Sequence, residues 1–219
     1  MKPQLFAHPF SSYCQKVLVA LYENDTPFEW RLLSQDTPEV EAEWAALWPM
    51  KRMPLLKDGG ETVVEATIII EYLMLSHPGP VRLIPSDPKS ALKTRFMDRF
   101  FDNYVMTPMQ EIVFNQIRPE DDRDPYGVRQ ARTMLDMAYG FLDDAMAKTE
   151  WAAGDRFSLA DCAACPSLFY ADWVQPIPET FANVRAYRAR LLSRPSFARA
   201  VDEARPYRHF FPLGAPDRD

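Results

Sequence analysis

A proline-rich stretch from His77 to Ser90 limits what this 219-residue chain can fold into more than any other feature. Before this stretch, segments of strand and helix periodicity alternate, and after it only helical periodicity recurs. Four prolines interrupt regular structure inside it: Pro78, Pro80, Pro85 and Pro88. The sequence therefore predicts an α/β domain over residues 1–78, a linker over 79–88 and an all-α domain over 89–219.

The first 78 residues predict the order strand, helix, strand, helix, strand, strand, helix. A short apolar run ends near Ala7, and apolar residues recur at helical spacing from Ser12 onward. Residues 27–34 alternate in polarity as a half-buried strand does, and Asp58-Gly59-Gly60 is typical of a hairpin turn. Helical crossovers make the first two strands parallel, and the tight turn makes the last two antiparallel.

Everything after the linker is predicted to be helical. The first long segment, residues 90–106, places apolar residues at steps of four and so forms one continuous face. That face consists of Leu92, Phe96, Phe100 and Tyr104. Four more helical segments are expected, at residues 124–148, 158–173, 180–194 and 195–204.

Composition and spacing exclude several classes of protein. The 25 basic and 31 acidic residues give a net charge of −6 without a basic cluster, which excludes a nucleic-acid partner. The most apolar run is broken by Glu71 and is too short to span a membrane, and the first residues lack the core of a signal peptide. Three cysteines are too few for a disulfide framework, so a cytoplasmic protein is expected.

Metal and nucleotide sites are not expected either. The three histidines, His8, His77 and His209, lie far apart in the sequence. The seven glycines include no glycine-rich dinucleotide fingerprint.

The start of the first helix carries Ser11, Ser12 and Cys14. Free backbone N–H groups and the helix dipole stabilise an anion there, and a serine hydroxyl would add a directed hydrogen bond. A serine at this place is also a common helix cap, and a cysteine one turn into a helix is often a buried apolar group. The residues alone leave both interpretations open.

Two further segments each allow a binding interpretation and a purely structural one. A cis Met53–Pro54 bond would turn the backbone of Met53 outward to grip an extended peptide, whereas a trans proline would only open a strand. Backbone amides around Glu65, Ala66 and Thr67 could hold a carboxylate at a helix start, or Glu65 could simply favour that helix end.

Taken in order, these motifs resemble the cytosolic glutathione transferases of the bacterial, serine-type kind. The matching segments are SSYCQKV from Ser11, RMP from Arg52, EATIIIEYL from Glu65 and SLAD from Ser158. The resemblance implies a thioredoxin-like βαβαββα domain followed by a helical domain, with glutathione as co-substrate and no metal or nucleotide. Ser158 and Asp161 would form a capping box that serves folding.

The resemblance also implies a set of site residues. Ser11 would donate a hydrogen bond to the glutathione sulfur, with Ser12 as runner-up and Cys14 as an alternative nucleophile. The glutathione-binding residues would be Arg52, Met53, Pro54, Glu65, Ala66 and Thr67. The electrophile would lie between the domains, beside His8, Phe10, Tyr104, Met106 and Met109, although these side chains could equally be core.

The expected activity is attack of a glutathione thiolate on an electrophilic small molecule, by a homodimer. Two positions depart from the family: Ala66 stands where serine is usual, and Trp48 where asparagine is frequent. Losing a hydrogen bond to a charged group costs about 1.5–3 kcal/mol, unless Thr67 or backbone amides replace it. Alternatives are a reductase that depends on Cys14, a non-catalytic binding protein, and isomerisation of a small activated diacid.

Overall fold

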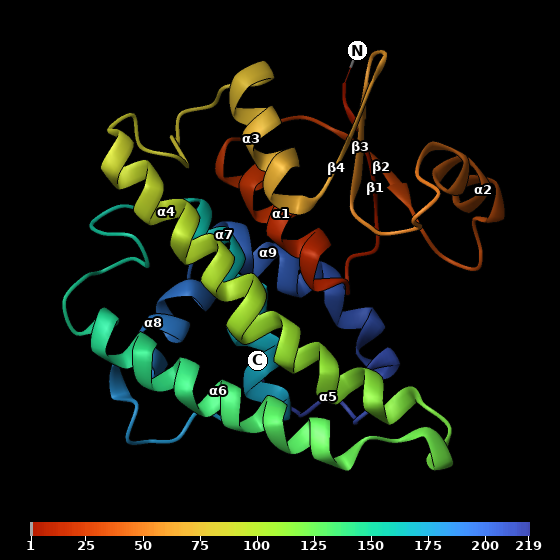
Figure 1. Ribbon diagram of the computed structural model, residues 1–219. Coiled ribbons are helices and arrows are strands. Elements are labelled where there is room, and N and C mark those ends of the chain that lie inside the picture. The colour runs from red at the N-terminus through yellow and green to blue at the C-terminus, as the bar shows by residue number, and fades with distance from the viewer. Residues whose placement is uncertain (1) are drawn as a thin grey trace.

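The computed structural model describes residues 2–219 and contains a small sheet with three helices, followed by a helical region (Figure 1). The first region follows the predicted order of elements. These are β1 (Gln4–Ala7), α1 (Ser12–Glu23), β2 (Glu29–Leu32), α2 (Pro38–Leu47), β3 (Leu55–Asp58), β4 (Glu61–Val64) and α3 (Ala66–Ser76).

The four strands lie in the order β2-β1-β3-β4. β1 and β2 are parallel, with Leu5 opposite Trp30, while β3 is antiparallel to both β1 and β4. The predicted strand directions are therefore confirmed. α1 and α3 pack on the face that carries Leu5 and Leu56, and α2 packs on the opposite face (Figure 1).

The second region is helical throughout its regular elements, as predicted. Its helices are α4 (Pro88–Phe100), α5 (Thr107–Ile117), α6 (Pro125–Met146), α7 (Leu159–Val174), α8 (Ala182–Leu192) and α9 (Pro195–Ala204). Two short 3₁₀ helices, Glu120–Asp122 and Arg205–Phe210, complete it.

A π-helix, Phe101–Met106, joins α4 to α5 without a break in the helical path. A π-turn adds a residue to the turn and so changes which side chains face the neighbouring helices. The steps-of-four pattern did not reveal this change. Leu92, Phe96 and Tyr104 share an exposed face, where the rings of Phe96 and Tyr104 both approach Phe100.

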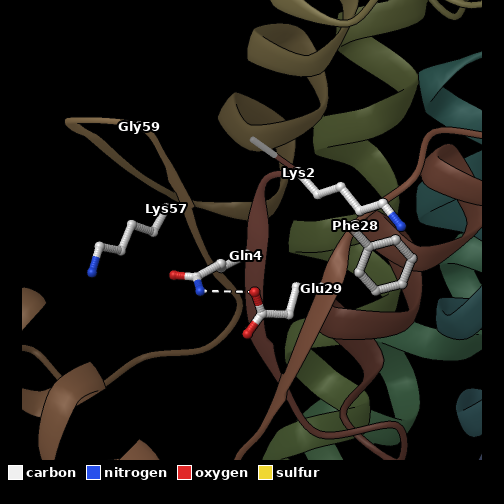
Figure 2. Close-up of a pocket in the computed structure, with 6 residues that line it drawn as sticks. All are labelled: Lys2, Gln4, Phe28, Glu29, Lys57 and Gly59. Carbon is white, nitrogen blue, oxygen red and sulfur yellow. Dashed lines mark hydrogen bonds between the residues drawn. The ribbon is translucent and has the colours of Figure 1, made fainter.

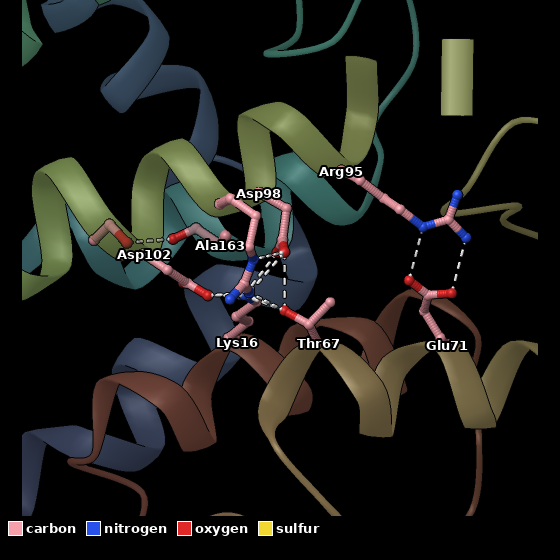
Figure 3. A network of polar contacts seen from close by, with 9 residues as sticks. Lys16, Thr67, Glu71, Arg95, Asp98, Asp102 and Ala163 are labelled. Atoms are coloured by element: carbon pink, nitrogen blue, oxygen red, sulfur yellow. Dashed lines mark hydrogen bonds and ion pairs between the residues drawn. The ribbon is translucent and has the colours of Figure 1, made fainter. Parts of the chain in front are cut away.

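The two regions meet along α1, which packs against both α3 and α7. Lys16 of α1 is almost wholly buried at this contact, with its Nζ 2.6 Å from Asp98 Oδ1 and 2.8 Å from Asp102 Oδ2. Thr67 of α3 accepts a hydrogen bond from Lys16 Nζ and donates one to Asp98 Oδ2, both of 2.9 Å (Figure 3). One buried polar network therefore ties α1 and α3 to α4 and the π-helix.

The capping box predicted at the start of α7 is present. Asp161 Oδ2 accepts from the backbone N–H and the hydroxyl of Ser158, each at 2.9 Å. Its Oδ1 accepts from the N–H of Ala152 and from the hydroxyl of Tyr187. All four contacts are buried, so this carboxylate fixes the helix start inside the core.

Among residues 2–219, no helix combines the length and the apolar character that crossing a membrane requires.

Candidate functional site

The start of α1 places two serine hydroxyls at the edge of a cavity. Ser11 occupies the N-cap position with extended backbone, but its side chain makes no capping hydrogen bond. Its carbonyl instead receives the N–H of Gln15, and Ser12 follows as the first helical residue, 8% exposed. The hydroxyl of Ser11 is thus not used as a cap, which removes the simplest structural reason for a serine at this position.

Cys14 lies one turn into the helix and is completely buried. Burial raises the pKa of its thiol to about 11, although a hydrogen bond with Ser11 lowers it in part. A reactive cysteine needs an accessible thiolate. The environment of Cys14 is that of a core residue rather than that of a nucleophile.

A cavity of about 300 Å³, here called the polar cavity, opens beside α1, α3 and the cis peptide bond between Met53 and Pro54. Five of the six residues expected to bind glutathione line it: Arg52, Met53, Pro54, Glu65 and Ala66. The sixth, Thr67, lines a second cavity of similar size that shares Glu65 and Ala66 with the first. The fold therefore brings five of these residues, from two separate segments, around one cavity, and places the sixth in the neighbouring cavity.

Glu65 is the most strained residue of this site. It precedes α3 with a backbone φ of 70°, a value that residues other than glycine rarely adopt. Such a conformation costs about 1–3 kcal/mol and is typical of functional sites. The turn at Glu65 leads directly into the first amides of α3, which border the cavity.

Three residues that the sequence did not single out also line both cavities: Tyr13, Arg99 and Asp102. Burial, and next the charge of Asp102, raise the pKa of Tyr13 to about 12, so its hydroxyl keeps its proton at neutral pH. In the sequence, Tyr13 belongs to the apolar pattern that runs from Ser12 onward. Arg99 and Asp102 belong to the helical region, and only the docking of the two regions brings them to the site.

A third cavity, of about 290 Å³, borders the start of α1 and is here called the apolar cavity. Ser11 and Ser12 form one wall, and Phe10 and Met109, two of the residues proposed beside the electrophile, also line it. Other side chains come from α5 and from the C-terminal segment: Val113, Phe114, Phe210, Phe211 and Pro212. His8 packs edge-on against Tyr207 beside this segment, and burial lowers its pKa.

The structure does not bring Tyr104 and Met106 to the apolar cavity. Tyr104 is 45% exposed and packs on Phe100, whereas Met106 is 1% exposed and belongs to the core. Both lie in the π-helix, whose altered turn the sequence pattern did not reveal.

A larger cavity, about 580 Å³, lies elsewhere, beside Gln4 of β1, Phe28 and Lys57 of β3 (Figure 2). Gln4 there donates to Glu29 at 2.9 Å. None of the expected site residues lines it. Size alone therefore does not identify the site in this protein.

Within the described part of the chain, residues 2–219, no group of three or more His, Cys, Asp or Glu side chains is arranged to hold a metal ion.

Two family models match the chain at the regions that build this site. The model described as glutathione S-transferase, N-terminal domain, matches residues 5–81, and that of the C-terminal domain matches residues 105–195. The chain belongs to the glutathione S-transferase family. Its four-stranded mixed sheet followed by helices is the thioredoxin-like fold that this family predicts.

Individual relatives of similar identity carry different names. Glutathione S-transferase hmp2 of Hypomyces subiculosus is 27% identical, and the alignment covers 87% of this chain and 94% of that relative. Maleylacetoacetate isomerase of Mus musculus is 27% identical over 78% of this chain and 79% of its own. FtsZ-localized protein A of Caulobacter vibrioides is 28% identical over 86% of both. Identity at this level does not choose between their activities.

Among solved structures, a glutathione S-transferase from Methylobacterium radiotolerans, in complex with glutathione sulfonate, is 27% identical with a TM-score of 0.78. The match covers 92% of this chain and 95% of that one. The fold is therefore shared over nearly the whole length.

Proposed function

We propose that the protein is a glutathione transferase that holds glutathione in the polar cavity and turns its thiol into a thiolate at the start of α1. Family membership supports glutathione transferase activity in general. The observation that carries the finer proposal is that two unlike cavities border the start of α1. The polar cavity is lined by Tyr13 together with Glu65, and the apolar cavity is lined by Ser11 and Ser12, so consecutive residues border both.

In this arrangement, Arg52, the backbone of Met53 and Pro54 would bind the peptide part of glutathione. Glu65 and the first amides of α3 would bind its γ-glutamyl end. The sulfur would then lie at Ser11, with Ser12 as the second choice. A free thiol has a pKa of about 8.5, and a charge-assisted hydrogen bond plus the helix end would lower it by about one to two units.

The thiolate would attack an electrophilic carbon of a small molecule in the apolar cavity. The new carbon–sulfur bond forms as the leaving group departs with the electron pair of its bond to that carbon. The aromatic and methionine side chains of this cavity suit an apolar electrophile.

The test compares Ser11→Ala, Ser12→Ala and Cys14→Ala by the ultraviolet absorbance of the bound thiolate as a function of pH. Replacing the serine that contacts sulfur should raise the pKa of bound glutathione by about one to two units and slow conjugation of 1-chloro-2,4-dinitrobenzene about 10- to 100-fold at neutral pH. Cys14→Ala should leave that pKa unchanged. An unshifted thiol pKa in the unmodified protein would contradict the proposal.

The reductase alternative requires Cys14 as nucleophile, and the burial of this thiol argues against it. Loss of turnover in Cys14→Ala alone would reverse that judgement. The non-catalytic alternative stays open, because one relative, FtsZ-localized protein A, has a name that refers to localization and not to an activity. Glutathione binding by calorimetry, without conjugation of any electrophile in a panel, would favour it.

The homodimer expected from the resemblance is also part of the proposal. Leu92, Phe96 and Tyr104 leave an exposed apolar face along α4 and the π-helix, which Phe141 of α6 extends. A second copy of the chain would cover this face. Light scattering of Phe96→Glu against the unmodified chain tests it, with a shift to monomer expected.

A division into two domains at residues 79–88 and a cytoplasmic location complete the proposal. No helix or strand lies between Ser76 and Pro88, and the three cysteines are free.

A further inference from the structure

The loop that carries Ser11 is held from the helical region as well as from its own domain. Tyr170 of α7 donates a hydrogen bond from its hydroxyl to the carbonyl of Phe10, at 3.0 Å. The rings of Tyr170 and Phe10 also meet edge to face, with their centroids 5.5 Å apart. The residue before Ser11 is therefore anchored to a helix that lies 160 positions further along the chain.

Gln15 holds the same loop from α1. Its backbone N–H donates to the carbonyl of Ser11 at 2.9 Å. Its side-chain Nε2 donates to the carbonyl of Pro9 at 3.0 Å and to the hydroxyl of Tyr170 at 3.1 Å. A chain of hydrogen bonds thus runs from Gln15 through Tyr170 to Phe10, and three consecutive carbonyls of the loop each accept a hydrogen bond.

The amide of Gln15 is not explained by stability. The side chain is completely buried, and its Oε1 has no hydrogen-bond donor in the described part of the chain. A buried acceptor without a donor is destabilising, and an apolar side chain of similar size would avoid that loss. The two hydrogen bonds from Nε2, to the loop and to its anchor Tyr170, are what the amide adds at this position.

Tyr170 also lines the apolar cavity, together with Ser11. Its hydroxyl donates its one proton to the carbonyl of Phe10 and accepts from Gln15. Burial raises the pKa of this hydroxyl, so it keeps the proton at neutral pH. The ring of Tyr170 therefore borders the space for the electrophile, whereas its hydroxyl is engaged with the loop and is not free to donate to a substrate.

We propose that Tyr170 and Gln15 are positioning residues, which hold the loop so that the hydroxyl of Ser11 points at the sulfur of bound glutathione. The inference rests on the proposed function, because it takes Ser11 as the serine that contacts sulfur. Ser11 makes no capping hydrogen bond, so the direction of its hydroxyl depends on the backbone of this loop. A displacement of about 1 Å in such a group can slow a reaction about 100-fold. The helical region then takes part in thiol activation as well as in forming the apolar cavity.

Tyr170→Phe is the central variant, because it removes only the hydroxyl and leaves the ring in the apolar cavity. The pKa of bound glutathione, measured from thiolate absorbance against pH, should rise by about half a unit to one unit. The kcat for 1-chloro-2,4-dinitrobenzene should fall about 3- to 10-fold at neutral pH. The KM for this electrophile and the Kd for glutathione should change less than about twofold, because the ring and the polar cavity are unaltered.

Two further variants test whether the effect passes through the serine. In a Ser11→Ala background, Tyr170→Phe should add less than about 0.2 unit to the thiol pKa, because no hydroxyl is left to position. Gln15→Met keeps the length of the side chain but donates no hydrogen bond, and it should shift the thiol pKa in the same direction as Tyr170→Phe. The result therefore does not depend on the folding of one variant.

Tyr139→Phe is the matched control. Tyr139 is also a buried tyrosine of the helical region, and its hydroxyl donates to a backbone carbonyl, that of Gln175, at 2.9 Å. This change removes an equivalent hydrogen bond away from the loop, so it should leave the thiol pKa and kcat unchanged. Urea denaturation of both phenylalanine variants checks that a difference in activity does not follow from a difference in stability.

The outcomes separate the two proposals. If Ser11→Ala raises the thiol pKa but Tyr170→Phe does not, the positioning role is overturned while the proposed function stands. The same holds if Tyr170→Phe acts equally with and without the Ser11 hydroxyl. If Ser11→Ala leaves the thiol pKa unchanged, the assignment of Ser11 falls and the positioning role falls with it.

Discussion

Two buried carboxylates, Asp161 and Asp102, show how differently this protein uses the same group. Asp161 accepts four hydrogen bonds, two on each oxygen, from Ala152, Ser158 and Tyr187. Asp102 has one oxygen held by Lys16 and Arg99 and the other without a donor. Both side chains are buried, but Asp161 has four neutral donors on two oxygens, whereas Asp102 has two cationic donors on one oxygen.

The two carboxylates also differ in where their donors come from. Asp161 lies inside the helical region, where nearby segments supply every donor. Asp102 lies where the two regions meet and lines two cavities. A buried carboxylate oxygen without a donor calls for an explanation, so Asp102 is the one to test against ligand binding.

The largest expected effect is on stability, at Asp161. Asp161→Asn places an amide N–H₂ group against N–H and O–H donors and leaves buried donors without an acceptor. The free energy of unfolding should fall by about 3 kcal/mol or more. Urea denaturation measures it, and glutathione binding by the fraction that remains folded should be unchanged. A decrease of less than about 1 kcal/mol in the free energy of unfolding would show that the four hydrogen bonds of Asp161 contribute little to stability.

The next effect is on affinity, at Asp102. Asp102 lines the cavity in which glutathione is proposed to bind. Asp102→Asn should weaken glutathione binding about 10- to 100-fold, because the amide lacks the negative charge that would attract the α-ammonium group of glutathione. Its cost in stability should be smaller than that of Asp161→Asn, since one oxygen has no partner to lose. Glutaryl-cysteinylglycine, which lacks the α-amino group, should bind the variant and the unmodified protein alike. Equal affinity of Asp102→Asn and the unmodified protein for glutathione would show that Asp102 does not differ from Asp161 in ligand binding.

The smallest effect concerns pH and a third buried group, Cys14. Burial raises the pKa of this thiol from 9.0 to about 11, so the unfolded chain releases the proton first. Stability from this group is therefore complete below pH 9 and is lost as pH rises towards 11, by about 1 kcal/mol per unit. Urea denaturation of the unmodified protein and of Cys14→Ala, each measured across this pH range, gives the contribution of Cys14 as the difference between their free energies of unfolding. Rapid alkylation of Cys14 in the folded protein at pH 8 would contradict the burial and the raised pKa of this thiol.

Features that depend on local sequence were predictable. The Asp58-Gly59-Gly60 turn, the order of strands and helices and the capping box at Ser158 all depend on neighbours a few residues apart, and the structure has each of them. The candidate binding residues from Arg52 to Thr67 lie in the same region of the chain, near its strand and helix starts. Their roles stay predictions.

Features that depend on how the two regions dock were not predictable. In the sequence, Asp98, Arg99 and Asp102 look like ordinary charged positions of an amphipathic helix. Their approach to Ala66 depends on the packing of α4 over α1 and α3. The π-helix also has no signature in the apolar spacing, and Tyr104 within it lies exposed beside Phe100 and does not line the apolar cavity.

The Lys16 network has a consequence for how the two regions come apart. Its members come from both sides of one boundary, so a ligand bound among them would have to be released before either region could open separately. A small co-substrate bound at this boundary would therefore stabilise both regions together, and the stabilisation would increase with the occupancy of the cavity.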